Sequence, residues 1–177
     1  MKVRNTKFEG LKIIEGKNYY DTRGFFREIF VKKKLAIHSP IFWCMSKSRK
    51  NVLRGLHLQT DNSQEKFISV IKGEILDVVV DLRKSSKTFG KHFKIILSDK
   101  NVKSLLIPSG FAHGFLGLAN ENIVIYSNNK YRSKKSETGI IWNDNKLKIK
   151  WPKRKLIISK KDKKNLTFED FCRRNKI

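Results

Sequence analysis

Short apolar runs bounded by turn residues recur along most of this chain, and this pattern is typical of β-strands. Helical periodicity is almost absent between the runs, so their regular spacing predicts an antiparallel sandwich or jelly roll. No repeat, linker or low-complexity segment interrupts the pattern, and we expect one domain over residues 1–177. The expected strands are residues 11–14, 25–30, 52–59, 67–71, 75–83, 93–97, 102–107, 115–118 and 123–126.

Two of these strands are predicted to form a hairpin, because only Lys72-Gly73-Glu74 separates residues 67–71 from residues 75–83. In the second strand, alternation divides the side chains between two faces. One face holds Leu76, Val78, Val80 and Leu82, and the other holds Asp77, Asp81 and Arg83 with Val79.

The C-terminal tail is the exception to the strand pattern. Thr167 is a good helix cap, Asp170 falls in the first turn, and Arg173 and Arg174 fall in the last. The expected fold is therefore all-β, with a short C-terminal helical segment.

The charge of the chain is strongly unbalanced, with 40 Lys and Arg against 16 Asp and Glu, a net charge of +24. This favours anionic partners such as phosphorylated metabolites or nucleic acid. A nucleic-acid surface would interleave aromatic and basic residues on one exposed strand face. The tryptophans and most phenylalanines instead fall in apolar segments, so we expect no nucleic-acid partner and interpret most lysines as surface residues.

Two cysteines, Cys44 and Cys172, are too few for a secreted disulfide scaffold or a structural zinc site. The first residues lack the apolar run of a signal peptide, and no stretch approaches the ~18 apolar residues of a membrane span. We expect a cytoplasmic protein without a membrane partner.

His57 and His113 each lie close to a glycine in an otherwise apolar segment, whereas His38 and His92 are expected at the surface. A lone histidine in such a strand is by default a hydrogen-bonded core residue. The nearby glycines favour a site, since they permit a bend or a close approach of backbone to ligand.

A metal site is the first rival for paired histidines in a β-barrel. Metal-binding barrels of the cupin type use a His-x-His pair, but Gln59 follows His57 by two positions and Phe115 follows His113 by two. We therefore expect neither a metal nor another cofactor.

The surrounding residues suit proton removal beside a ketone, which needs a base, a stabiliser of the enolate oxygen and an acid. Histidine is a natural base near neutral pH. Lys66 and Arg54 can supply positive charge to an enolate or a phosphate. Tyr126 can donate a proton if it faces a cavity, although the residues alone favour a half-buried strand aromatic. The aspartates available to orient a histidine are Asp77, Asp81 and Asp162.

At these segments the chain resembles the dTDP-4-dehydrorhamnose 3,5-epimerase family of cupin-like nucleotide-sugar epimerases. The resemblance runs in order from about residue 8 to residue 165. It is carried by Asp21-x-Arg23-Gly24-x-Phe26-x-Glu28, Asn51-Val52-Leu53-Arg54-Gly55-Leu56-His57-x-Gln59, Asp77-Val78-x-Val80-Asp81-x-Arg83, Ile107-Pro108-x-Gly110-Phe111-Ala112-His113-Gly114-Phe115, Trp142-Asn143-Asp144 and Trp151-Pro152.

The resemblance implies a cupin-like jelly-roll homodimer whose N-terminal strand contributes to the partner's site. It implies epimerisation of dTDP-4-dehydro-6-deoxyglucose to dTDP-4-dehydrorhamnose at C3 and C5 through an enolate. By position, His57 is the base, Asp162 orients it, and Tyr126 is the acid on the opposite face of the sugar. His113 and Asp77 form a second, supporting pair.

The resemblance also implies ligand contacts. Lys66 lies by the keto oxygen, and Arg54 and Arg23 lie near the diphosphate. In a regular strand Arg54 and His57 face opposite sides, so both reach one ligand only if Gly55 bends the strand or Arg54 lies at the rim. Further ligand-contacting positions are Glu28, Tyr131, Glu137 and Lys161.

Three positions depart from the family pattern. Phe42 and Cys44 replace a glutamine and an asparagine, and Arg132 replaces an aromatic residue after Tyr131. Two alternatives therefore stay open: a single-carbon epimerase or ketoisomerase on another nucleotide sugar, and a non-enzymatic β-barrel that binds nucleotides or nucleic acid. A catalytically inactive sugar-binding module would have little need for His57, Tyr126 and Asp162 together.

Overall fold

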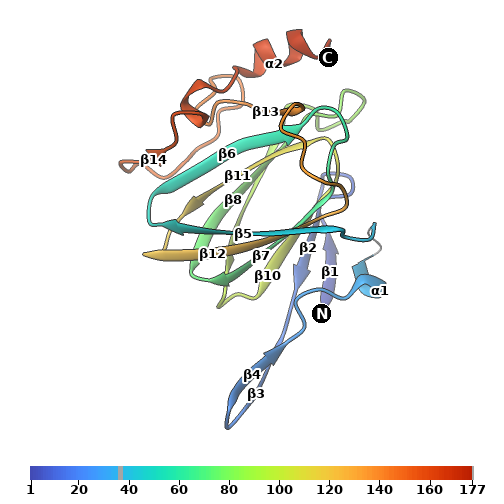
Figure 1. Cartoon of the computed structure of the whole chain (residues 1–177), viewed down its shortest axis with the longest axis vertical. Coiled ribbons are helices and arrows are strands. Elements are labelled where there is room, and N and C mark those ends of the chain that lie inside the picture. Colours follow the sequence, from blue (N-terminus) through green and yellow to red (C-terminus); the bar gives the residue numbers. More distant parts are fainter. Residues whose placement is uncertain (36–37, 177) are drawn as a thin grey trace.

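The computed structural model describes residues 1–35 and 38–176, and two antiparallel sheets face each other in it (Figure 1). The first has the order β1 (Lys2–Asn5), β2 (Lys12–Glu15), β10 (Lys103–Ile107), β7 (Lys66–Lys72), β12 (Glu121–Asn128) and β5 (Phe42–Arg49). The second has the order β13 (Glu137–Gly139), β6 (Val52–Gln59), β11 (Phe111–Gly117), β8 (Glu74–Asp81) and β9 (His92–Ser98), with β14 (Ile157–Ile158) parallel to β6. The predicted antiparallel jelly roll is confirmed.

Among the described residues, the two largest apolar clusters hold the sheets and the C-terminal segment together. The space between the sheets is filled from both sides, for example by Ile68 and Val124 from the first sheet and Val79 and Phe115 from the second. The outer face of the second sheet is covered by the C-terminal segment, whose Phe171 packs with residues of β6, β8 and β11. The alternation predicted for β8 is confirmed, because Leu76, Val78, Val80 and Leu82 belong to the outer cluster.

The predicted hairpin between residues 67–71 and 75–83 is wrong. β7 pairs with β10 and β12, whereas β8 pairs with β11 and β9, so the chain crosses between the sheets at Gly73. A single residue between the strands is too short for the two-residue turn of a hairpin. Gly73 has φ +85°, and an added Cβ would lie 2.1 Å from the Glu121 carbonyl oxygen, so glycine is required at this crossing.

In residues 1–35 and 38–176, three short helices accompany the sheets: α1 (Lys32–Leu35), the 3₁₀ turn η1 (Asp162–Lys164) and α2 (Phe168–Arg174). The predicted C-terminal helix is confirmed, since the Thr167 hydroxyl accepts a hydrogen bond from the Asp170 N–H at 3.1 Å. Within the described residues no helix is long and apolar enough to cross a membrane.

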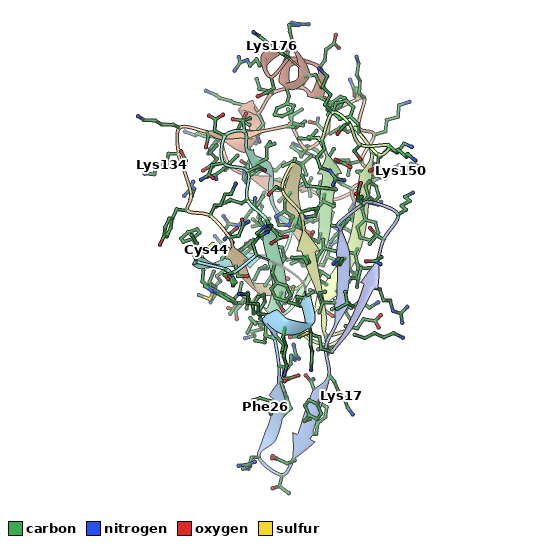
Figure 2. All side chains as sticks on the ribbon, turned by 90° about the vertical axis from the view of Figure 1, so that its right-hand side faces the viewer. Lys17, Phe26, Cys44, Lys134, Lys150 and Lys176 are labelled. Atoms are coloured by element: carbon green, nitrogen blue, oxygen red, sulfur yellow. The ribbon has the colours of Figure 1, made fainter. Side chains whose placement is uncertain are left out.

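A separate two-stranded hairpin, β3 (Asn18–Asp21) with β4 (Gly24–Arg27), projects away from the two sheets (Figures 1 and 2). We call residues 18–27 the arm. Phe26 lies on it, far from the body of the barrel in the view of Figure 2, and Lys17 lies at its base. The arm exposes four aromatic side chains, Tyr19, Tyr20, Phe25 and Phe26.

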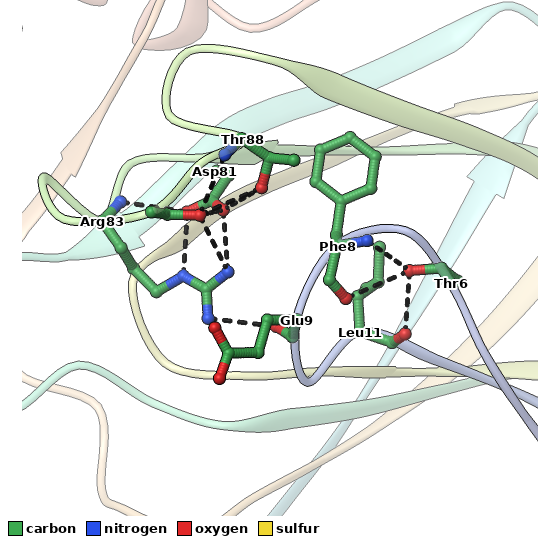
Figure 3. Close-up of polar contacts among 8 residues, drawn as sticks. Thr6, Phe8, Glu9, Leu11, Asp81, Arg83 and Thr88 are labelled. Carbon is green, nitrogen blue, oxygen red and sulfur yellow. Dashed lines mark hydrogen bonds and ion pairs between the residues drawn. The ribbon is translucent and has the colours of Figure 1, made fainter.

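The carboxylate of Asp81 organises the loop after β8 (Figure 3). Its two oxygens accept hydrogen bonds from Arg83 at 2.7 and 2.9 Å and from the hydroxyls of Ser86 and Thr88 at 2.6 Å each. Burial alone would raise the pKa of Asp81, but these donors outweigh it and lower the pKa to about 2. The same Arg83 donates to the Glu9 carbonyl oxygen at 3.0 Å, which ties the loop to the N-terminal segment.

We expect Asp81→Asn to lower the free energy of unfolding at neutral pH by about 2–4 kcal/mol, because it removes a buried, fully bonded charge. The stabilisation from a lowered carboxyl pKa is present above the unfolded-state value near 3.8 and is lost as the pH falls towards about 2. Urea unfolding at several pH values measures both effects. If the loss in free energy of unfolding caused by Asp81→Asn were the same at pH 6 and at pH 2, this role for the charge would be contradicted.

Candidate active site

A pocket of about 660 Å³ opens between the two sheets, lined by side chains from β5, β6, β7, β11 and β12. His57, His113, Arg54, Lys66 and Tyr126 all line it, and Asp162 and Lys161 close it from the C-terminal segment. The fold therefore gathers into one cavity residues that are far apart along the chain. His38 and His92 lie outside the pocket lining; His38 is exposed, as expected, whereas His92 is half-buried rather than at the surface.

His57 and Asp162 form a close pair at the pocket wall. The His57 Nε2 atom lies 2.6 Å from Asp162 Oδ1, and the Gly55 N–H donates to Asp162 Oδ2 at 3.2 Å. The Asp162 N–H in turn donates to the Ser159 hydroxyl oxygen at 3.0 Å, which fixes the start of η1. Burial of Asp162 acts to raise its pKa, but the bonds from His57, Gly55 and Ser159 outweigh burial and lower it. Asp162 is thus held as a carboxylate against the imidazole.

A β-bulge brings Arg54 and His57 to the same pocket. On β11, His113 is paired with His57 and Phe115 with Arg54, so two residues of β6 face the single Gly114. Gly55 has φ +116°, and a Cβ added to it would lie 2.6 Å from the Gly114 Cα. Of the two arrangements expected, the structure shows the bend at Gly55, and the bend requires glycine on both strands.

Tyr126 lies on β12 in the first sheet, so it faces the pocket from the wall opposite His57, which lies in the second. Its hydroxyl is 2.9 Å from the Ser46 Oγ atom. Burial raises the pKa of Tyr126, which keeps the phenol protonated at neutral pH. Tyr126 is a half-buried strand aromatic, as the residues alone favour, and it also faces the cavity, which is the condition under which it could donate a proton.

His113 and Asp77 form a second, deeper pair. The His113 Nε2 atom lies 2.8 Å from Asp77 Oδ2, and Asp77 is completely buried. Among the described residues, no donor reaches Asp77 Oδ1. The His113 and Tyr126 rings are 6.3 Å apart between centroids, in an edge-on arrangement. The second pair therefore lies on the same sheet as His57, with the His113 ring directed towards Tyr126 on the other sheet.

Lys66 is a cation of the pocket that forms no ion pair with any of the described residues. Although part of the side chain is accessible through the pocket, burial lowers the pKa of Lys66 to about 8, against the opposing effects of Cys44, Glu137 and Asp77. Arg54 is better tethered, since its Nε donates to the Ser48 hydroxyl at 2.9 Å. These two cations are suited to anionic oxygens of a ligand.

Glu137 links two further cations at the pocket edge. Arg132 Nε donates to Glu137 Oε2 at 2.7 Å, and Lys161 pairs with the other oxygen of the same carboxylate. Burial acts to raise the pKa of Glu137, but the bonds from Lys161 and Arg132 lower it overall. The carboxylate is therefore ionised and holds both cations at the rim.

Four predicted site residues are absent from the pocket lining: Asp77, which lies behind His113 and is bonded to it, and three residues that lie elsewhere, Arg23, Glu28 and Tyr131. Arg23, in the turn of the arm, pairs with Asp21 at 2.6 Å, and Glu28 pairs with Lys34 at 3.3 Å. Tyr131 is exposed, with its ring 6.5 Å from that of Phe42. The described chain does not bring these three side chains to His57.

Sequence reasoning assigned no role to three serines that hold the site residues in place: Ser46 contacts Tyr126, Ser48 anchors Arg54, and Ser159 anchors Asp162. The available signal was period-2 alternation in β5, where Phe42, Cys44 and Ser46 share the face that lines the pocket. Within the described ranges, no cluster of three or more His, Cys, Asp or Glu is suited to a metal ion.

A cupin-like jelly roll, with a buried histidine–carboxylate pair and a tyrosine facing each other across a cation-lined pocket, has the architecture of the cupin-like nucleotide-sugar epimerases. The family model described as dTDP-4-dehydrorhamnose 3,5-epimerase matches residues 5–170. The dTDP-4-dehydrorhamnose 3,5-epimerase of Shigella flexneri is 42% identical over 176 residues, which cover 96% of this chain and 97% of that protein. The chain belongs to the dTDP-4-dehydrorhamnose 3,5-epimerase family.

Solved structures are similar over almost the whole chain. The Legionella pneumophila dTDP-6-deoxy-D-glucose-3,5-epimerase, solved in complex with dTDP-4-keto-L-rhamnose, has a TM-score of 0.91 and 40% identity, with 95% of this chain and 93% of that chain covered. The Sulfolobus tokodaii dTDP-4-dehydrorhamnose 3,5-epimerase has a TM-score of 0.86 and 44% identity, with 95% of each chain covered.

Proposed function

We propose that this protein converts dTDP-4-dehydro-6-deoxyglucose to dTDP-4-dehydrorhamnose by epimerising C3 and C5, without a metal or another cofactor. The observation that supports this most directly is the placement of His57 and Tyr126 on opposite walls of one pocket. Inversion at carbon needs a base on one face of a planar intermediate and an acid on the other.

His57 is the proposed base. Because Asp162 holds its Nε2 atom, Nδ1 is the nitrogen left to take a proton from C3 or C5, the two carbons beside the C4 ketone. The C–H electron pair moves to the C4 oxygen and forms an enolate, whose charge the Lys66 ammonium stabilises. The carboxylate of Asp162 stabilises the imidazolium that results.

Tyr126 is the proposed acid. Its O–H donates a proton to the opposite face of the enolate, the enolate electrons form the new C–H bond, and the ketone is restored. The raised pKa of the phenol ensures that it holds the proton before transfer. His113, held by Asp77 on the sheet of His57, supports Tyr126 from across the pocket, and Arg54, Glu137 and Lys161 are the proposed contacts of the nucleotide part.

We also propose a homodimer in which the arm of each chain reaches its partner's pocket. The arm exposes aromatic side chains, among them Tyr20 and Phe26 at 75% and 69%, and β5 is an open sheet edge with Trp43 and Met45 exposed. Such a surface is typical of an interface. In this arrangement Arg23 and Glu28, which are remote from their own pocket, contact ligand bound to the other chain.

Incubation with dTDP-4-dehydro-6-deoxyglucose in D₂O tests the proposed reaction. NMR should show deuterium at both C3 and C5 and inverted configuration at both carbons. Exchange at neither carbon by folded, dTDP-binding protein would contradict the proposed activity.

A single-carbon epimerase is the second candidate, and Phe42 and Cys44 are the observation that favours it. Both line the pocket, where they offer an apolar ring and a thiol in place of amide hydrogen-bonding groups. A different sugar pose would present only one of the two carbons to His57. In the same NMR experiment, deuterium at one carbon alone would establish this alternative.

The charge on Lys66 predicts an alkaline limit to activity. The ammonium form stabilises the enolate, so kcat/KM should fall as the pH rises through about 8, the pKa of Lys66 in the free protein. Lys66→Arg should move this limit to higher pH, because arginine keeps its charge. An alkaline limit that is unchanged in Lys66→Arg would assign the titration to another group.

A further inference from the structure

We propose that residues 153–164, which we call the basic rim, form an electrostatic entrance that speeds the capture of a diphosphate-bearing ligand by the pocket. This inference rests on the proposed function, because it requires an anionic nucleotide sugar. The basic rim would act during approach, before the ligand makes its final contacts.

The basic rim lies directly at the pocket mouth. β14 runs parallel to the start of β6, with Ile157 opposite Val52 (Figure 1), and residues 157–159, 161 and 162 line the pocket. The cations of this segment lie before, among and after these lining residues, and Lys161 is itself one of them. The cations are Lys153, Arg154, Lys155, Lys160, Lys161, Lys163 and Lys164, all of them exposed.

The positive charge of the basic rim is almost uncompensated. Its one acid, Asp162, is buried and bonded to His57, and Lys161 pairs with Glu137. Within residues 1–35 and 38–176, none of the other six cations forms an ion pair, and Arg154 contacts only the neutral side chain of Asn51. Arg54 and Lys66 add positive charge inside the same pocket, so the field at the mouth attracts anions.

The concentration of charge distinguishes the basic rim from general surface lysines. Seven of the twelve residues 153–164 are Lys or Arg, against 40 of 177 in the whole chain. Charges within about one Debye length, ~8–10 Å at physiological salt, act together on an approaching anion. Focused fields of this kind raise association rates by about 10- to 1,000-fold in favourable cases.

Neutralising the basic rim provides the test, in the full-length protein. The rim variant carries Lys153→Gln, Lys155→Gln and Lys160→Gln, and none of these side chains is assigned a contact with bound substrate. The control variant removes the same charge at three exposed lysines outside the pocket lining, with Lys87→Gln, Lys91→Gln and Lys100→Gln. Association with dTDP is followed by stopped-flow tryptophan fluorescence across a salt series, and kcat is measured in parallel.

We expect the rim variant to associate with dTDP about 3- to 10-fold more slowly at low salt, with dissociation and kcat nearly unchanged, and the difference to vanish at about 0.5 M salt. The control variant should change by less than about 2-fold. Equal effects of the two variants, or no effect of either, would overturn the inference. Loss of DNA binding by the rim variant with unchanged dTDP association would also overturn it, and would assign the basic rim to nucleic acid.

Failure of the proposed function is distinguishable from these outcomes. Wild-type protein that binds dTDP with rim-dependent kinetics but does not epimerise would contradict only the proposed reaction. If the wild type epimerises but the rim variant associates with dTDP as fast as the control variant, only this inference is contradicted. Wild-type protein that does not bind dTDP would contradict both.

Discussion

His57→Asn should abolish both deuterium exchange and epimerisation, with a loss of about 10²–10⁴-fold. Asparagine keeps a polar side chain but is too short to replace the Nε2 contact with Asp162, which keeps the hydrogen bond from the Gly55 N–H. The amide cannot accept a proton near neutral pH. With no base on that wall of the pocket, the enolate does not form at either carbon. Proton NMR in D₂O, with incorporation at C3 and C5 followed over time, measures exchange and inversion in one sample.

The matched control is His92→Asn. His92 lies on β9, is half-buried and does not line the pocket. This variant should keep the activity of the wild type, which separates loss of a base from a general effect of removing imidazole. Substantial epimerisation by His57→Asn would contradict the whole scheme.

Local sequence patterns predicted the structure correctly where a regular strand packs against other residues on both of its faces. The expected strand over residues 52–59 matches β6, and Thr167 marks the start of the C-terminal helix. The alternation in β8 also separates the two faces correctly, because each face packs against a different apolar layer. In these segments the periodicity of burial follows directly from the periodicity of the backbone.

The pattern of apolar residues did not predict β5 as a strand, and it predicted a hairpin at Gly73 that the structure does not contain. β5 is an edge strand with one face lining the polar pocket and the other exposing Trp43 and Met45, so the usual contrast between a buried and a solvated face is absent. At Gly73 the two flanking strands belong to different sheets, and their apolar content is compatible with either pairing. Local composition does not specify which strand is the neighbour.

The candidate active site could be predicted even less well from local sequence than the strand pairing. Asp162 is 105 residues from His57 in the chain, and its neighbours Lys161, Lys163 and Lys164 suggest a solvated turn. Only the family resemblance singled it out among three available aspartates. Its contact with His57 depends on β14 pairing with β6, a long-range arrangement that no local period encodes.

Tyr126→Phe should separate the two proton transfers. Removal of the phenol hydroxyl deletes the acid on the first sheet but leaves His57, Asp162 and Lys66 in place. The enolate still forms and can be reprotonated on its original face by imidazole that has exchanged with solvent. We therefore expect epimerisation to fall by about 10²–10⁴-fold while much of the deuterium exchange persists.

Ser46→Ala provides a matched control for this asymmetry, because it removes the hydrogen-bond partner of the Tyr126 hydroxyl but leaves the acid itself. Ser46→Ala should slow epimerisation and keep the ratio of exchange to inversion near that of the wild type. The ratio is informative because loss of fold or of ligand binding lowers exchange and inversion together. Loss of the acid alone lowers inversion but not exchange. An equal loss of exchange and inversion in folded, dTDP-binding Tyr126→Phe would count against Tyr126 as the acid.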